Sequence, residues 1–214
     1  MDFFSGVPLK DFEFSPDTSR VGVIPYIGNK FFMFLGSRFG QLSDAGGKKE
    51  QEDKDYIDCA IRELYEESIK ILDFIENKEN FISRSFVLPI NPTFPLILLD
   101  LGDDDFDCEI TEEDFKIFQR NYKKAYKATF LNHNKYREVK GIIVVDFEDL
   151  VKIIYSDRDC TIEDDIKGFC ASGIKCESET TRKILKHEEF PNIWIETNNV
   201  LKMHLLLKQP SKEV

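Results

Sequence analysis

Three glutamates that could hold a metal ion lie within the segment Arg62-Glu63-Leu64-Tyr65-Glu66-Glu67. Residues three and four apart share one face of an α-helix, so a helix here places Glu63, Glu66 and Glu67 within about one turn of each other. Carboxylates spaced in this way repel one another, and a divalent cation bound between them offsets that repulsion. Mg²⁺ prefers hard oxygen ligands and keeps several waters that a phosphate can replace. The spacing therefore predicts a magnesium site that acts on a phosphate-bearing substrate.

A solvated acidic face is the structural alternative, and for an isolated helix it is the commoner explanation. The flanking sequence favours the metal site. Gly46-Gly47-Lys48 precedes the glutamates, and a glycine lets the backbone pass close to a phosphate or a metal. We therefore expect backbone groups of Gly47 to be possible ligands.

The glutamates need a rigid support, and the sequence predicts a helix over Tyr56–Leu72. Apolar residues recur there at three- and four-residue steps, so one helix face can pack on a core while the carboxylates face outward. Asp53 or Asp55 is the expected N-cap. The apolar positions are Ile57, Ala60, Ile61, Leu64 and Ile69.

The remaining elements predict an α+β fold. Two apolar runs joined by Gly28-Asn29 indicate a buried β-hairpin, and a glycine-rich loop and the charged stretch Lys48–Asp55, which is not expected in the core, lead from it into the helix. A second strand pair, a late strand, a helical insertion at 111–132 and C-terminal helices follow. The expected strands are Val21–Ile27, Phe31–Leu35, Phe81–Ile90, Phe94–Leu101 and Val139–Phe147, and the expected later helical segments are Thr111–Asn132, Asp149–Ile154, Thr180–His187 and Thr197–Leu207.

Composition bounds the class of protein. The chain has 214 residues, 42% of them hydrophobic, which suits a single domain over 1–214. Its formal net charge of -11 disfavours broad binding to DNA or to a membrane surface. Five cysteines and three histidines show no zinc-site spacing. With no long apolar stretch and no signal-peptide pattern, we expect a soluble cytoplasmic protein.

The segment 46–69 resembles the Nudix box, whose pattern is G-x5-E-x7-R-E-U-x-E-E-x-G-U, where U is an aliphatic residue. Two departures accompany the match: Gly47 and Arg62 lie one residue further apart than in the pattern, so the first glutamate of the box falls on Asp53 or Glu52, and Ile69 stands where the family has a glycine. The matching residues are Gly47, Arg62, Glu63, Leu64, Glu66 and Glu67.

This resemblance implies a Nudix-type α/β/α sandwich with a mixed sheet and a Mg²⁺- or Mn²⁺-dependent hydrolysis of a phosphoanhydride bond. Glu63, Glu66 and Glu67 would bind the metal, Glu66 or Glu67 would act as general base, and Arg62 would orient the carboxylates. Nudix enzymes often add an acid from outside the box, for which Glu138 is the candidate, with an ordinary exposed glutamate as the alternative. By the same resemblance Lys48 would contact a phosphate, with a surface lysine as the alternative, and Arg38, at the end of the second strand, is a further candidate for substrate binding.

The substrate stays open at the level of sequence. Asp58–Glu67 is similar to the same stretch of eukaryotic mRNA-decapping enzymes and of Nudix proteins of large cytoplasmic DNA viruses, which implies the 5′ cap of RNA. The basic residues of 116–127 would then be the RNA path, although the solvated side of a helix is the favoured explanation for them. Dinucleoside polyphosphates and diphosphoinositol polyphosphates are alternatives. So is an inactive Nudix-fold module that binds a nucleotide or a partner. The sequence leaves open the oligomeric state and the role of residues 155–214.

Overall fold

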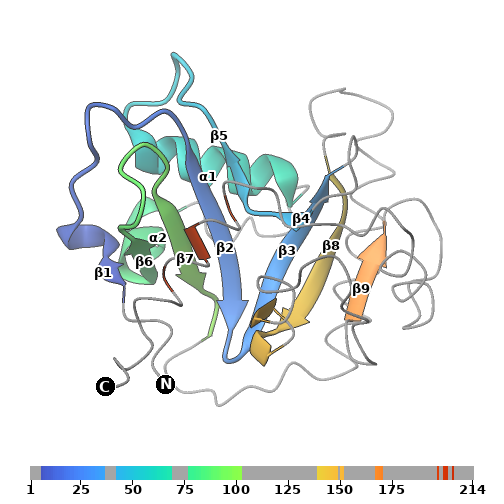
Figure 1. Cartoon of the computed structure of the whole chain (residues 1–214). Helices are drawn as coiled ribbons and strands as arrows, with labels where there is room; N and C mark the ends of the chain where they lie inside the picture. Colours follow the sequence, from blue (N-terminus) through green and yellow to red (C-terminus); the bar gives the residue numbers. More distant parts are fainter. Residues whose placement is uncertain are drawn as a thin grey trace, which may run out of the picture.

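The computed structural model is centred on one mixed β-sheet (Figure 1). It describes residues 6–36, 42–68, 77–102, 139–148, 150–151, 167–170, 197, 200–201 and 204. The strands are β1 (Val7–Pro8), β2 (Val21–Ile27), β3 (Lys30–Gly36), β4 (Leu42–Ser43), β5 (Ala45–Gly47), β6 (Ser85–Leu88), β7 (Leu96–Asp100), β8 (Val139–Asp146) and β9 (Lys167–Cys170). The helices are the 3-10 turn η1 (Leu9–Asp11), α1 (Tyr56–Glu67) and α2 (Lys78–Ser83).

The strands run in the order β1-β6-β7-β2-β3-β8-β9, with β4 and β5 attached to β3 and β2. β2 and β7 are parallel, and the other described pairs are antiparallel. This confirms the predicted α+β class with a mixed sheet. No helix in the described part of the chain is long and apolar enough to cross a membrane.

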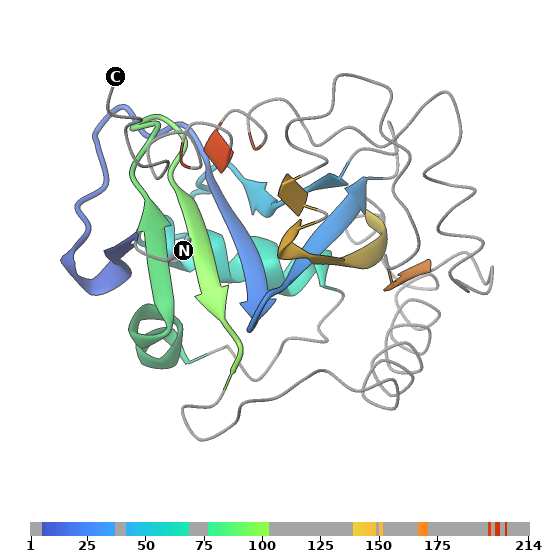
Figure 2. The same cartoon turned by 60° about the horizontal axis from the view of Figure 1, so that its bottom comes forward.

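Both faces of the sheet are covered, which explains why its strands are almost continuously apolar. Side chains alternate between faces, so Val21 and Val23 of β2 pack beneath α1 and α2, whereas Ile24 and Tyr26 pack on the opposite face. The opposite face is covered by buried residues from later, helical parts of the chain, namely Leu150, Val200 and Leu201. Figures 1 and 2 show α1 and α2 together on one side of the sheet.

β2 and β3 diverge away from their turn, and β5, which carries Gly46 and Gly47, pairs with β2 where the two strands have separated (Figure 1). The strands pair only beside their turn, at Tyr26↔Phe31 and Ile27↔Lys30. Farther from the turn they diverge, β5 pairs with Val21–Val23, and β4 pairs with the end of β3. The glycine-rich segment predicted as a loop is therefore partly strand, because the diverging edges of β2 and β3 offer backbone partners that the local sequence does not reveal.

The hairpin of β2 and β3 and the late strand β8 confirm the sequence predictions. Phe81–Ile90 was predicted as one strand, and this is wrong: α2 runs to Ser83 and only Ser85–Leu88 is strand. The side chain of Asn77 accepts a hydrogen bond from the Glu79 N–H and starts α2, whose Phe81 is buried. A short apolar run does not separate a single helical turn from a strand.

The described helical residues agree with two further predictions. Phe147, Glu148, Leu150 and Val151 fall in or beside the expected turn at 149–154, and Thr197, Val200, Leu201 and His204 fall in the expected helix at 197–207. The predicted insertion at 111–132 and the helix at 180–187 lie outside the described residues.

Candidate functional site

Helix α1 is fixed against the sheet by one face and by its first turn. Cys59, Ala60 and Leu64 are buried in the core between α1 and the sheet. Of the two expected caps, Asp55 is the N-cap, and its Oδ1 accepts hydrogen bonds from the N–H groups of residues 57 and 58, each at 2.9 Å. Lys78 of α2 donates to Asp55 Oδ2 at 2.6 Å. The described helix ends at Glu67, with Ser68 as its C-cap. Continuation toward Leu72 lies outside the described residues.

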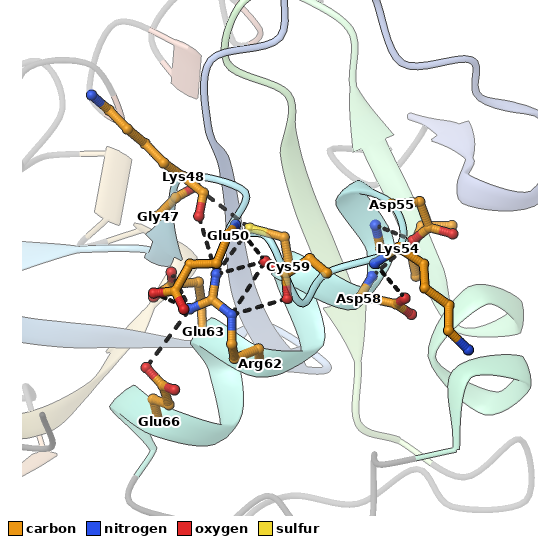
Figure 3. A network of polar contacts seen from close by, with 12 residues as sticks. Gly47, Lys48, Glu50, Lys54, Asp55, Asp58, Cys59, Arg62, Glu63 and Glu66 are labelled. Carbon is orange, nitrogen blue, oxygen red and sulfur yellow. Dashed lines mark hydrogen bonds and ion pairs between the residues drawn. The ribbon is translucent and has the colours of Figure 1, made fainter.

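Arg62 is the centre of a polar network at the junction of α1 and the chain that leads into it (Figure 3). Its guanidinium donates to both carboxylate oxygens of Asp53, with Nε to Oδ1 at 3.1 Å and Nη2 to Oδ2 at 2.9 Å. Nη2 also donates to the Lys48 carbonyl at 3.1 Å. Arg62 thus ties the loop after β5 to the helix.

Asp53 and Glu52, between which the spacing left a choice, differ in their surroundings. Of the two candidates for the first acid of the motif, Asp53 is buried and bonded to Arg62, while Glu52 is exposed. The hydrogen bond from Arg62 is the largest cause that holds the pKa of Asp53 below its usual value. The expectation that no part of Lys48–Asp55 is core is therefore wrong at Asp53, because a charged partner accompanies it into the interior.

Glu63 and Glu66 face the same guanidinium from the helix. Arg62 Nη1 lies 2.7 Å from Glu63 Oε1 and 3.7 Å from Glu66 Oε2. Glu63 also lies against Gly47, because a Cβ built there would stand 2.1 Å from Glu63 Oε1. The absence of a side chain at Gly47 lets this carboxylate lie against β5 in its present position.

Glu67 points back toward the glycine pair rather than toward Arg62. The Gly46 N–H donates to Glu67 Oε1 at 3.4 Å. Burial first, and then the negative charges of Asp44 and Glu63, raise the pKa of Glu67 well above its usual value. The carboxylates at this end of α1 therefore share a region that is short of positive charge.

These residues fit a divalent cation by their chemistry. In the described ranges, no three His, Cys, Asp or Glu side chains converge as a metal-binding group, and Arg62 lies among the carboxylates instead. The donors are nevertheless the hard oxygens that Mg²⁺ and Mn²⁺ prefer.

Three other candidate site residues were predicted from the sequence, and one of them, Lys48, lies in the described part of the chain. The Lys48 side chain is exposed and extends away from Arg62 (Figure 3). Arg38 and Glu138 lie outside the described residues. The structure thus brings Gly47, Arg62, Glu63 and Glu66 together, places Glu67 beside Gly46, and connects Lys48 to Arg62 through its backbone carbonyl.

Two residues beside the site were missed from the sequence. Asp44, two positions before Gly46, is buried and pairs with Arg20 at the start of β2, with Arg20 Nη2 2.9 Å from Asp44 Oδ2. In the sequence, Arg20 and Asp44 are charged residues beside apolar ones. Such residues usually lie in solvent, so the sequence does not predict that these two pair in the interior.

The comparisons with known proteins are weak. No family model matches the chain, and no curated protein matches it. One similar solved structure is a bifunctional NMN adenylyltransferase/ADP ribose pyrophosphatase complexed with AMP and a Mn ion from Francisella tularensis, at 15% identity and a TM-score of 0.30. The match covers 57% of this chain and 42% of that one, so this chain spans less than half of its length. At this TM-score the likeness establishes neither a shared fold nor an activity.

Proposed function

We propose that the protein is a Nudix-type hydrolase that cleaves a phosphoanhydride bond with Mg²⁺ or Mn²⁺. The observation that carries the proposal is the arrangement of Glu63, Glu66 and Glu67 on one anchored helix beside the Gly46-Gly47 strand. A solvated acidic face would not need a glycine at 47 to make room for Glu63, nor an arginine bonded to a buried Asp53. Both features support a site rather than an ordinary surface.

We assign each residue of the site a separate role in hydrolysis. Glu63, Glu66 and Glu67 would hold the cation, a backbone group of Gly47 would be a further ligand, and Arg62 would orient Glu63 and Glu66. Mg²⁺ or Mn²⁺ held there would supply positive charge for a bridging diphosphate and for the water that attacks phosphorus. The carboxylate of Glu66 or Glu67 would accept the proton of the attacking water. Lys48, whose ammonium group reaches solvent, contributes positive charge to a phosphate group.

The substrate class that suits this chemistry is a nucleoside diphosphate linked to another group. Within that class we propose the 5′ cap of RNA as the finer assignment, which rests on the similarity of Asp58–Glu67 to decapping enzymes. The net charge of -11 favours a small nucleotide over a long polyanion. Dinucleoside polyphosphates and inositol pyrophosphates therefore belong in the same assay.

The test is a hydrolysis panel followed by mass spectrometry. The protein is incubated with Mg²⁺ or Mn²⁺ and with capped RNA, dinucleoside polyphosphates, ADP-ribose, nucleoside triphosphates and inositol pyrophosphates. We expect one class to be cleaved at a diphosphate bridge, and EDTA to abolish the activity until the metal is restored. Binding of a metal-nucleotide complex without turnover of any substrate would instead indicate a binding module.

Single substitutions test the assignment of the site. Glu66→Gln and Glu67→Gln should each reduce turnover on the order of 10²-fold or more, because each removes a charged group that acts on the reacting centre. Glu79→Gln, an exposed glutamate on α2, is the matched control and should keep wild-type turnover. Unchanged rates in both site variants, with circular dichroism showing intact folds, would mean that the catalytic residues lie elsewhere.

A further inference from the structure

Asp44 is a buried acid that lies behind the glycine pair rather than in the open part of the site. It stands between β4 and β5, and its side chain is completely shielded from solvent. Arg20 Nη2 donates to Asp44 Oδ2 at 2.9 Å, and Thr197 Oγ1 donates to Asp44 Oδ1. A buried carboxylate is stable only when it is paired and hydrogen-bonded, and these two groups meet that requirement from opposite ends of the chain.

The sheet has a gap built for this carboxylate. Gly22 of β2 and Gly46 of β5 are cross-strand partners. A Cβ on Gly22 would stand 2.0 Å from Asp44 Oδ2, and a Cβ on Gly46 would stand 2.5 Å from the same atom and 2.7 Å from Arg20 Nη2. The paired glycines therefore leave the space that the Arg20–Asp44 pair occupies.

The ring of Phe94 packs against Arg20 of this pair on the face of the sheet opposite α1. Arg20 Cζ lies 4.4 Å from the centroid of the Phe94 ring, which belongs to the core on that face. Thr197 precedes Val200 and Leu201, which pack in the same core. Asp44 thus connects the C-terminal part of the chain to the strand that carries the glycines.

Gly46 links this buried pair to the candidate metal ligands. Its Cα faces Asp44, while its N–H donates to Glu67 Oε1 at 3.4 Å. One glycine therefore stands between the buried carboxylate and a carboxylate of the site.

We propose that Asp44, held by Arg20 and Thr197 in the space left by Gly22 and Gly46, is a positioning residue that sets the divalent-cation affinity of the site through Gly46 and Glu67. The inference rests on the proposed function, since it needs Glu67 to be a metal ligand. If Asp44 loses its charge, the Arg20 guanidinium is left without its counter-charge, and only Gly46 separates it from Glu67. That cation competes with a metal for the same carboxylates, and the Gly46 backbone loses its support.

The experiment measures Mn²⁺ binding directly, by calorimetry on the full chain without substrate. We expect Asp44→Asn to weaken Mn²⁺ binding by about tenfold or more, as substitutions that support metal ligands commonly do. Asp17→Asn is the matched control, because it removes the same charge at an exposed position. With substrate, saturating Mn²⁺ should restore most of the turnover of Asp44→Asn, because Asp44 acts through the metal and touches no reacting atom.

A second pair of variants keeps the test decisive if Asp44→Asn does not fold. Thr197→Val removes the hydroxyl that donates to Asp44 while retaining shape and charge, and Thr197→Ser keeps the donor. We expect Thr197→Val to weaken Mn²⁺ binding by less than Asp44→Asn, and Thr197→Ser to bind Mn²⁺ close to the wild type. A purely structural role would lower the melting temperature of Thr197→Val without changing its Mn²⁺ affinity.

The outcomes separate the two proposals. If the wild type binds Mn²⁺ and Glu67→Gln weakens binding, while folded Asp44→Asn, or failing that Thr197→Val, binds as the wild type does, the inference about Asp44 is wrong and the proposed function stands. If the wild type does not bind Mn²⁺, or Glu67→Gln leaves binding unchanged, the proposed metal site itself is wrong.

Discussion

Two arginine–carboxylate clusters lie on either side of the Gly46-Gly47 strand, and they differ in charge balance and exposure. In the inner cluster one arginine, Arg20, pairs with Asp44, whose side chain is 0% exposed. In the outer cluster one arginine, Arg62, faces several carboxylates whose side chains are 5 to 46% exposed. Those carboxylates are Glu50, Asp53, Glu63 and Glu66.

The difference separates a structural pair from a site that can take a ligand. The inner cluster is formally neutral, with one positive and one negative group, and so it needs no further ion. The outer cluster has one positive group against four negative ones, an excess of three negative charges that an incoming cation can offset. Burial of a balanced pair fixes backbone position, while an exposed acidic excess attracts a cation.

The largest expected effect is the loss of Arg20. Arg20→Leu leaves Asp44 buried without its counter-charge, so we expect the free energy of unfolding in urea to fall by about 3–5 kcal/mol. The matched control is Arg84→Leu, because Arg84 Nη1 donates to the neutral Gly102 carbonyl at 3.2 Å and the loss should be about 1 kcal/mol. Equal losses in the two variants would contradict the view that the inner pair holds this part of the fold.

The adjacent glycines give the next largest effect and the sharpest contrast. A Cβ on Gly46 would lie 2.4 Å from the Val21 carbonyl oxygen, a backbone atom that cannot turn away. Gly46→Ala should therefore lower the free energy of unfolding by about 1–3 kcal/mol.

The three atoms nearest to a Cβ on Gly47 all belong to the carboxylate end of Glu63, which can rotate aside. Gly47→Ala should keep most of its stability but displace Glu63, so Mn²⁺ affinity and turnover should fall. Urea unfolding and calorimetry on both variants check the contrast. The predicted contrast is contradicted if Gly47→Ala is less stable than Gly46→Ala.

The smallest expected effect concerns Asp55, which caps α1 outside both clusters. Although burial raises its pKa, hydrogen bonds from Lys78 and from backbone N–H groups outweigh this and hold the pKa below its usual value. The stabilisation by Asp55 is therefore present above about pH 4 and is lost as pH falls through the lowered pKa. At pH 7, Asp55→Ala should cost about 1 kcal/mol in thermal unfolding.

Asn77→Ala is the control for this pH dependence. Asn77 caps α2 by accepting from the Glu79 N–H at 2.9 Å, and its amide does not titrate. Its cost should be similar at pH 7 and pH 3, whereas the cost of Asp55→Ala should shrink toward pH 3. A cost of Asp55→Ala that does not change with pH would contradict a role for the ionised carboxylate.

Local patterns predicted the parts of the site that lie on one element. The 3.6-residue period placed Glu63, Glu66 and Glu67 on one helix and buried Ala60 and Leu64 beneath it, as the structure confirms. The strands β2, β3 and β8 were also predictable, because their apolar runs are flanked by turn residues or charged residues. The turn of α2 was not, because six residues are too few to establish a helical period.

The sequence by itself determined the carboxylate helix, the glycine pair before it and the α+β class, since each depends on residues close together in the chain. Only the tertiary structure decided that Asp53 pairs with Arg62, that Glu67 faces Gly46, and that Asp44 is buried between Arg20 and Thr197. These contacts depend on the divergence of β2 from β3 and on Thr197, which lies 153 positions from Asp44 in the chain. Local spacing carries no information about such partners, because burial and pairing of a charge are set by what the fold brings to it.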